Sequence, residues 1–124
     1  MIRFRLALKP TAKWGMNELY ASAKHWSKRG SQAHEVHLLV KQAIRNQNRN
    51  VKPFKCPVSV RILYNSRLDL DNHGYLAKLI IDGMKGVLIE DDDRRYVKEI
   101  THGFHSGDPG VVLVEVKEIH EEAK

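Results

Sequence analysis

The sequence has a single cysteine and lacks any long hydrophobic run. Cys56 has no second cysteine with which to form an internal disulfide, as is usual for proteins of a reducing compartment. No apolar stretch approaches the ~18 residues that a transmembrane helix needs. Residues 1–5 already alternate between apolar and basic side chains and do not resemble a signal peptide. We therefore expect a cytoplasmic protein with no membrane partner.

Acidic residues are scarce in one part of the chain. Residues 1–56 hold twelve Lys or Arg and two Asp or Glu, whereas residues 57–124 hold nine and thirteen, and the whole chain has a net charge of +6. A basic segment neutralises nucleic-acid phosphates, and an acidic segment can hold a cation. The division favours a metal-dependent nuclease, with a DNA-contacting half at 1–56 and a metal-site half at 57–119. A basic protein without a nucleic-acid partner is the alternative.

At 124 residues the chain is long enough for one domain, 1–124, with a real core. Apolar spacings of three and four predict a helix from an N-cap at Ser31 to about Gln47, and a second helix within 71–86. A turn at 107–110 favours pairing of the last two strands as an antiparallel hairpin. The expected fold is α+β, with a mixed, largely antiparallel small sheet and two main helices packed on it. Alternation predicts the strands, which are 2–8, 58–64, 95–104 and 112–116.

The central stretch, 69–93, carries two groups of carboxylates. Asp69 and Asp71 are two residues apart, a helix follows with N-cap candidates Asp71 and Asn72 and a stop at Gly86, and the second group is 90–93. Oxygen ligands of this kind suit Mg²⁺ or Mn²⁺ and do not suit zinc. Grouped carboxylates repel one another unless a cation lies among them, and the basic side chains of the chain are an alternative to a metal.

The predicted central helix has a polar face as well as an apolar one. Lys78, Asp82 and Lys85 fall away from the apolar face. Asp71 and Lys78 are seven residues apart and are therefore expected on the same side of the helix, about two turns apart. The apolar face consists of Leu76, Leu79, Ile80, Gly83, Met84 and Val87.

This stretch resembles the RusA family of crossover junction endodeoxyribonucleases, which are often encoded by phages or prophages. The resemblance is carried by Arg67-Leu68-Asp69-Leu70-Asp71-Asn72, by Lys78 followed by Asp82, by Asp91-Asp92, and by Tyr96 to Ile100. It extends from Asn17 to about Ile119 and is specific only within 67–100. It implies a homodimer that resolves four-way (Holliday) DNA junctions by paired symmetric nicks, in DNA recombination and repair.

The resemblance also implies a set of site residues. The family's metal-binding Asp-x-Asp pair falls on Asp69 and Asp71, its last essential Asp on Asp92, and its catalytic Lys on Lys78. The cofactor is Mg²⁺, with Mn²⁺ as the alternative and no small-molecule cofactor, and Asp91 is a further candidate ligand. The usual family spacing places the Lys at position 75, where this chain has Tyr. Lys78 lies seven residues after the second Asp, and spacings of four and seven return to the same helix face.

The basic segment 9–30 interleaves aromatic residues with cations, which suits phosphate contacts and stacking on bases or sugars. Packing of its aromatic residues under the loop as a satellite core is the alternative. Further along, outward-facing Lys41, Arg45 and Arg49 either steer DNA or form a solvated helix face. The candidate DNA-binding residues are Lys13, Asn17, Lys24, Lys28, Arg29 and Arg67.

Other readings remain open at this point. The pair His34 and His37, and the group His102, His105 and Asp108, have spacings seen in metal sites, but surface or structural roles explain them as well. A different Asp-x-Asp enzyme, such as a phosphatase or a sugar-nucleotide transferase, normally has a larger α/β fold. A non-catalytic basic nucleic-acid-binding module explains the charge of 1–56 but not the grouped carboxylates.

Overall fold

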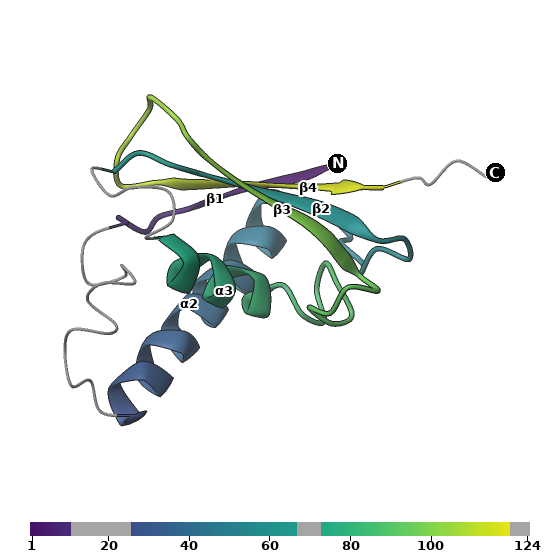
Figure 1. Ribbon diagram of the computed structural model, residues 1–124, viewed down its shortest axis with the longest axis horizontal. Helices are drawn as coiled ribbons and strands as arrows, with labels where there is room; N and C mark the ends of the chain where they lie inside the picture. The colour runs from purple at the N-terminus through teal and green to yellow at the C-terminus, as the bar shows by residue number, and fades with distance from the viewer. Residues whose placement is uncertain (11–25, 67–72, 120–124) are drawn as a thin grey trace.

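The computed structural model describes residues 1–10, 26–66 and 73–119, with the side chains of α2 described from residue 31 onward. Both helices cover the same face of one sheet (Figure 1). The expected α+β class is confirmed. Neither helix in the described part of the chain has the length and hydrophobicity to cross a membrane. The elements are β1 (Ile2–Leu6), α2 (Trp26–Gln47), β2 (Val58–Tyr64), α3 (Gly74–Gly83), β3 (Val97–Phe104) and β4 (Val112–Glu118).

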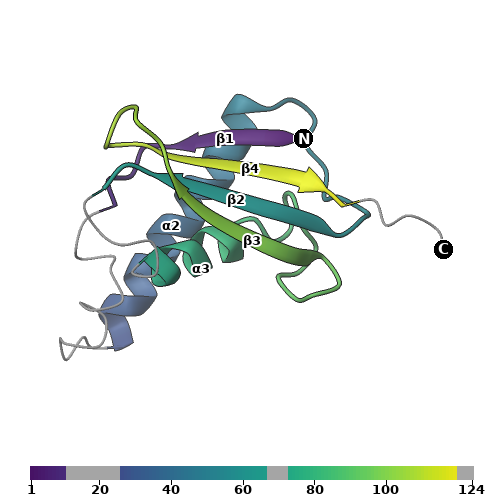
Figure 2. The same cartoon turned by 45° about the horizontal axis from the view of Figure 1, so that its top comes forward.

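The sheet has four strands in the order β1-β4-β2-β3 (Figure 2). Strand β4 runs antiparallel to both β1 and β2, so that Val114 lies opposite Phe4 on one side and Ile62 on the other. Strands β2 and β3 run parallel, with Tyr64 opposite Phe104. The sheet is therefore mixed and largely antiparallel, as the sequence predicts.

The expected hairpin between the last two strands is wrong, because β2 lies between β3 and β4. The turn itself is present, since the N–H of Val111 donates to the carbonyl of Asp108 at 3.1 Å. The chain leaves β3 past the end of β2, where the N–H of His105 donates to the carbonyl of Tyr64 at 2.8 Å. Burial explains the order: the alternate valines of β4 are fully buried, as suits a central strand, whereas most of β3 is exposed, as suits an edge.

The core lies between the sheet and the two helices. In α2 the side chains of Val36, Val40 and Ile44 are fully buried, but Leu39, which the pattern places on the same face, is 36% exposed. The proposed N-cap at Ser31 is wrong, because α2 already begins at Trp26. The remaining core consists of alternate residues of the strands and of one face of α3, among them Phe4, Val60, Ile62, Leu76, Ile80, Val114 and Val116.

Helix α3 is shorter than the sequence suggests. Its N-cap is His73 rather than Asp71 or Asn72, and Asp71, expected on the same side as Lys78, lies outside the described residues. It ends at Gly83, three residues before the predicted stop. Gly86 instead turns the chain beyond the helix with a φ of 81°, and the buried run 87–89 follows as expected.

Candidate active site

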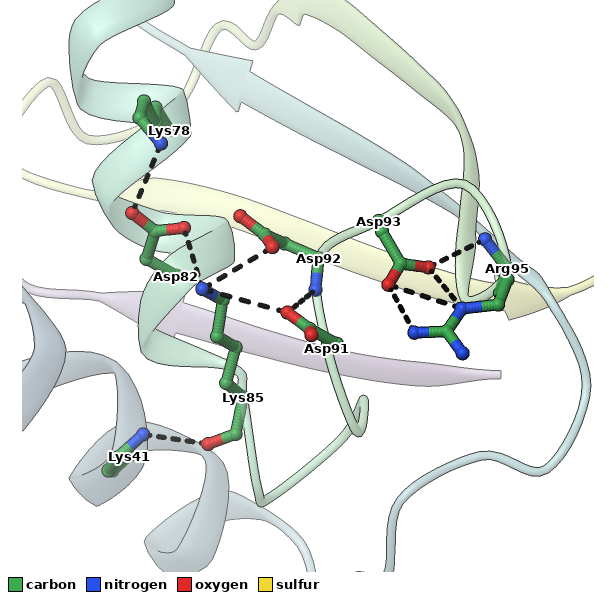
Figure 3. A network of polar contacts seen from close by, with 8 residues as sticks. All are labelled: Lys41, Lys78, Asp82, Lys85, Asp91, Asp92, Asp93 and Arg95. Carbon is green, nitrogen blue, oxygen red and sulfur yellow. Dashed lines mark hydrogen bonds and ion pairs between the residues drawn. The ribbon is translucent and has the colours of Figure 1, made fainter.

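The polar face of α3 carries a row of alternating charges (Figure 3). The ammonium of Lys78 lies 3.5 Å from Oδ2 of Asp82, one turn further along. The ammonium of Lys85, just beyond the helix, lies 3.6 Å from Oδ1 of the same carboxylate. These contacts follow from spacings of four and three residues, so the sequence pattern already contained this part of the site.

Lys85 is the centre of a larger acidic group. Its Nζ also lies 3.3 Å from Oδ1 of Asp92 and 3.8 Å from Oδ1 of Asp91, so three carboxylates surround one ammonium (Figure 3). Burial opposes the charge of Lys85, but the hydrogen bond to Asp92 and the charges of Asp82, Asp92 and Asp91 outweigh it and raise its pKa. We define Asp82, Lys85, Asp91 and Asp92 as the acidic cluster.

The backbone around Lys85 is fixed from two sides. The ammonium of Lys41, on α2, donates to the carbonyls of Gly83 at 2.8 Å and Lys85 at 3.0 Å. The N–H of Gly86 donates to the carbonyl of Ile89 at 2.7 Å, which closes the turn that returns the chain to Asp91. The position of the Lys85 side chain therefore depends on a contact between two helices and on a glycine turn, and neither is visible in a sequence pattern.

Asp92 is the most perturbed carboxyl of the acidic cluster. Its pKa is lowered to about 2, chiefly by hydrogen bonding shared with Asp82 and, against the effect of burial, by its contacts with Asp91 and with the ammonium of Lys85. The backbone N–H of Asp92 donates to Oδ1 of Asp91 at 2.8 Å, which orders the two carboxylates relative to each other. Asp93 points away from Lys85 and pairs with Arg95 at 2.8 Å instead (Figure 3). The acidic run 90–93 is thus divided between two environments.

A pocket of about 200 Å³ opens between α3 and β3 beside the acidic cluster. Lys78 and Asp92, which are fourteen positions apart in the chain, both line it. Its walls combine charged groups with an apolar floor, an arrangement common in binding sites. The lining residues are Gly74, Ala77, Lys78, Ile81, Asp82, Asp92, Ile100 and His102.

Sequence reasoning missed an aromatic column that supports this pocket. The ring of the buried Tyr64 stacks on His73 at 3.9 Å and lies parallel to His102 at 6.1 Å. The Tyr64 hydroxyl is 3.2 Å from Nδ1 of His102, and the Ser66 hydroxyl is 3.0 Å from Nε2 of His73. Burial raises the pKa of Tyr64 and lowers that of His102, so both groups are held neutral. The alternation of β2 and β3 placed Tyr64 and His102 on strands but gave no signal for this contact.

The histidines of the alternative metal sites differ in their contacts. His105 accepts a hydrogen bond at Nδ1 from the N–H of Gly107 and donates from Nε2 to the carbonyl of Val111, so both ring nitrogens are engaged. The buried Nε2 of His37 has no hydrogen bond. Over 1–10, 26–66 and 73–119, no three His, Cys, Asp or Glu side chains are arranged so that they could hold a metal ion together.

Part of the predicted site lies outside the described residues. The structure places Lys78, Asp91 and Asp92 in one neighbourhood, but the Asp-x-Asp pair, Asp69 and Asp71, is not among the residues described. The same holds for Lys13, Asn17, Lys24 and Arg67 among the candidate DNA contacts. Lys28 and Arg29 lie in the first turns of α2, and their side chains are not described.

Comparisons with protein families, with curated proteins and with solved structures found no match to this chain.

Proposed function

We propose that this protein is a metal-dependent endonuclease that acts on branched DNA, with the four-way junction as its substrate. The observation that carries the proposal is that Lys78 and Asp92 line the same pocket although they come from a helix and from the loop before β3. They are the two described members of the four catalytic residues implied by the resemblance to the RusA family. Their convergence is the arrangement that such a site requires.

The donor chemistry of the described residues fits a hard divalent cation such as Mg²⁺ or Mn²⁺. The low pKa of Asp92 keeps it ionised at neutral pH, and Asp91 lies next to it as a second oxygen donor. Asp69 and Asp71 would complete the ligand set. When bound, the cation supplies a water of lowered pKa and offsets charge on the phosphate.

Lys78 has a separate role in this proposal. Its side chain is 70% exposed and lies at the rim of the pocket, so its ammonium can reach a phosphate that approaches from solvent. The pairing with Asp82 orients it. We assign to Lys78 the stabilisation of negative charge on the phosphate, and to the basic residues of 1–56 the binding of the DNA backbone. A homodimer would place two such sites on one junction and so account for paired nicks.

One observation favours a second candidate function, a non-catalytic basic nucleic-acid-binding module. The ammonium of Lys85 lies within 3.8 Å of all three carboxylates of the acidic cluster. The cluster is therefore balanced in part by the chain itself, without a metal. In this alternative Asp82, Asp91 and Asp92 stabilise the turn after α3 and take no part in chemistry.

The two functions differ in what Mg²⁺ does to bound DNA. Purified protein is incubated with a labelled four-way junction and with a linear duplex, in Mg²⁺ or in EDTA. We expect Mg²⁺-dependent symmetric nicks on the junction alone. Asp92→Asn should abolish the nicks and retain binding, whereas the matched control Asp93→Asn, which alters only the pair with Arg95, should still cut. Binding without cuts in either Mg²⁺ or Mn²⁺ would favour the second function.

A further inference from the structure

A second pocket, of about 520 Å³, opens where the end of α2 meets the turn after α3. Two arginines and two asparagines line it on the side of α2, and no carboxylate among the described residues does. Its chemistry is therefore opposite to that of the acidic cluster. The lining residues are Arg45, Asn48, Arg49, Asn50, Val51, Gly86 and Val87.

The two arginines face the pocket without a carboxylate partner. Neither Arg45 nor Arg49 forms an ion pair with any residue that the structure describes. They are four positions apart in the sequence. Arg45 lies in the last turn of α2, where a cation complements the helix dipole, but Arg49 lies beyond the helix end at Gln47. The helix dipole therefore accounts for the position of Arg45 but not for that of Arg49.

The walls of this pocket are fixed by backbone contacts. Asn50 adopts a left-handed φ of 52°, which turns the chain after α2. The N–H of Phe54 then donates to the carbonyl of Leu88 at 2.8 Å, so the segment after the arginines is tied to the turn beyond α3. On that turn, a Cβ built on Gly86 would meet no atom within 4 Å. Because glycine has no side chain, the pocket stays open beside this turn.

The pocket adjoins the candidate active site. Lys41 lies one turn before Arg45 on α2, and its ammonium donates to the carbonyl of Lys85 at 3.0 Å. Burial, and next the charge of Arg45, lower the pKa of Lys41, so these two cations are within electrostatic reach of each other. Gly86, which lines the pocket, directly follows Lys85, whose ammonium lies in the acidic cluster. The pocket and the acidic cluster are thus connected through the adjacent residues Lys85 and Gly86.

We propose that Arg45 and Arg49 form a binding site for a phosphodiester of the DNA backbone, adjacent to the phosphate at the candidate active site. The inference rests on the proposed function. Arginine suits this task because its planar guanidinium donates two parallel hydrogen bonds to phosphate oxygens and stays charged at any physiological pH. The site binds without reading sequence and holds the strand in register with the acidic cluster.

The test measures binding of a labelled four-way junction in EDTA over a range of salt concentrations. Each of Arg45→Gln and Arg49→Gln removes one charge. The matched control is Lys117→Gln, because Lys117 is exposed on β4. Its neighbour Val116 faces the helices, so Lys117 points to the opposite side of the sheet. We expect each arginine variant to bind about five- to tenfold more weakly at 0.1 M salt. We also expect the slope of log affinity against log salt to fall by about 0.9 for each lost contact. Slopes equal to that of Lys117→Gln would overturn the proposal.

A second measurement separates this site from the proposed function. Inorganic phosphate is titrated into the protein while the amide signals of Gly86 and Val87 are followed by NMR. Shifts that saturate in the wild type and vanish in Arg45→Gln/Arg49→Gln support the anion site, even if the wild type fails to bind or cut DNA. Loss of the proposed function would then leave an anion site at Arg45 and Arg49 and overturn the assignment of DNA as its ligand. If the wild type cuts junctions but neither the salt slopes nor these signals respond to the two arginines, the site alone is wrong.

Discussion

The ammonium of Lys85 lies 3.3 Å from Oδ1 of Asp92, a carboxylate oxygen of the kind that also binds hard divalent cations. In the proposed function, Lys85 and the metal would compete for the same oxygens. The resemblance to a nuclease family names Asp92 and does not name Lys85. We therefore expect Lys85 to affect how tightly a cation is held.

Replacement of Lys85 by Met should strengthen Mn²⁺ binding. The change removes the internal cation and leaves Asp82, Asp91 and Asp92 to repel one another, so a divalent ion is bound at least about tenfold more tightly, which corresponds to ~1.4 kcal/mol. Isothermal titration calorimetry measures the affinity. Lys78→Met is the control, because Lys78 contacts only Asp82 of the cluster. Equal affinities for the two variants and the wild type would show that Lys85 does not compete.

Replacement of Gly83 by Ala should destabilise the fold although alanine is the better helix former. A Cβ at this position would lie 2.9 Å from Cβ of Val40 and 3.2 Å from Cα of His37, so α2 and α3 would have to separate. Overpacking of this kind costs about 1–3 kcal/mol. At Gly103 the contact is with the flexible end of Leu63, also at 2.9 Å, so Gly103→Ala should change the free energy of unfolding far less. Urea denaturation of both variants checks the difference, and equal losses would contradict the packing argument.

Replacement of Lys41 by Met should loosen the turn that carries Lys85. The substitution leaves the partly buried carbonyls of Gly83 and Lys85 without their donor, at a cost of about 1–3 kcal/mol. The exposed Lys52 gives the matched control, Lys52→Met, with a change within about 0.5 kcal/mol. Urea denaturation measures the stability, and hydrogen exchange at the amide of Gly86 reports the turn directly. An unchanged exchange rate would mean that Lys41 does not hold this turn.

Stability should fall with acidification in a way that depends on His102. Burial lowers the pKa of His102 below 6.5, so the native state favours the neutral ring, whose Nδ1 lies 3.2 Å from the Tyr64 hydroxyl. The unfolded state takes up the proton first, and the stabilisation is complete above pH 6.5 and lost as the pH falls through the folded pKa. Burial also lowers the pKa of His37, so His102→Gln should reduce the pH dependence between about pH 7 and 5 without abolishing it. Urea denaturation across this range measures it, and identical slopes for the variant and the wild type would refute the assignment.

Local patterns predicted the elements of this fold better than their arrangement. The alternation in 58–64 and 112–116 identified β2 and β4 because one face of each strand is buried. The hairpin error arose because a turn sequence specifies a reversal of the chain and says nothing about which strand fills the neighbouring position. The helix limits were missed because capping and glycine signals do not by themselves locate a helix end: α2 begins at Trp26, and α3 runs from Gly74 to Gly83.

The contacts of the candidate site were likewise predicted only in part. Lys78 and Asp82 are joined by helical spacing, which a sequence shows directly. The approach of Lys85 to Asp91 and Asp92 depends on the turn at Gly86 and on the contact of Lys41 across two helices, so no spacing could reveal it. The pocket at Arg45 and Arg49 likewise joins segments about forty residues apart.

The strand order also determines when this sheet can form. Strand β1 pairs with β4, so Phe4 finds its partner Val114 at the far end of the sequence, and β2 lacks its antiparallel neighbour until the same segment arrives. Such distant pairings make loop closure the slow step of folding. On the ribosome the helices can form early, while β1 must wait until β4 has emerged. The growing polypeptide therefore carries β1 unpaired while all the segments between these two strands are made.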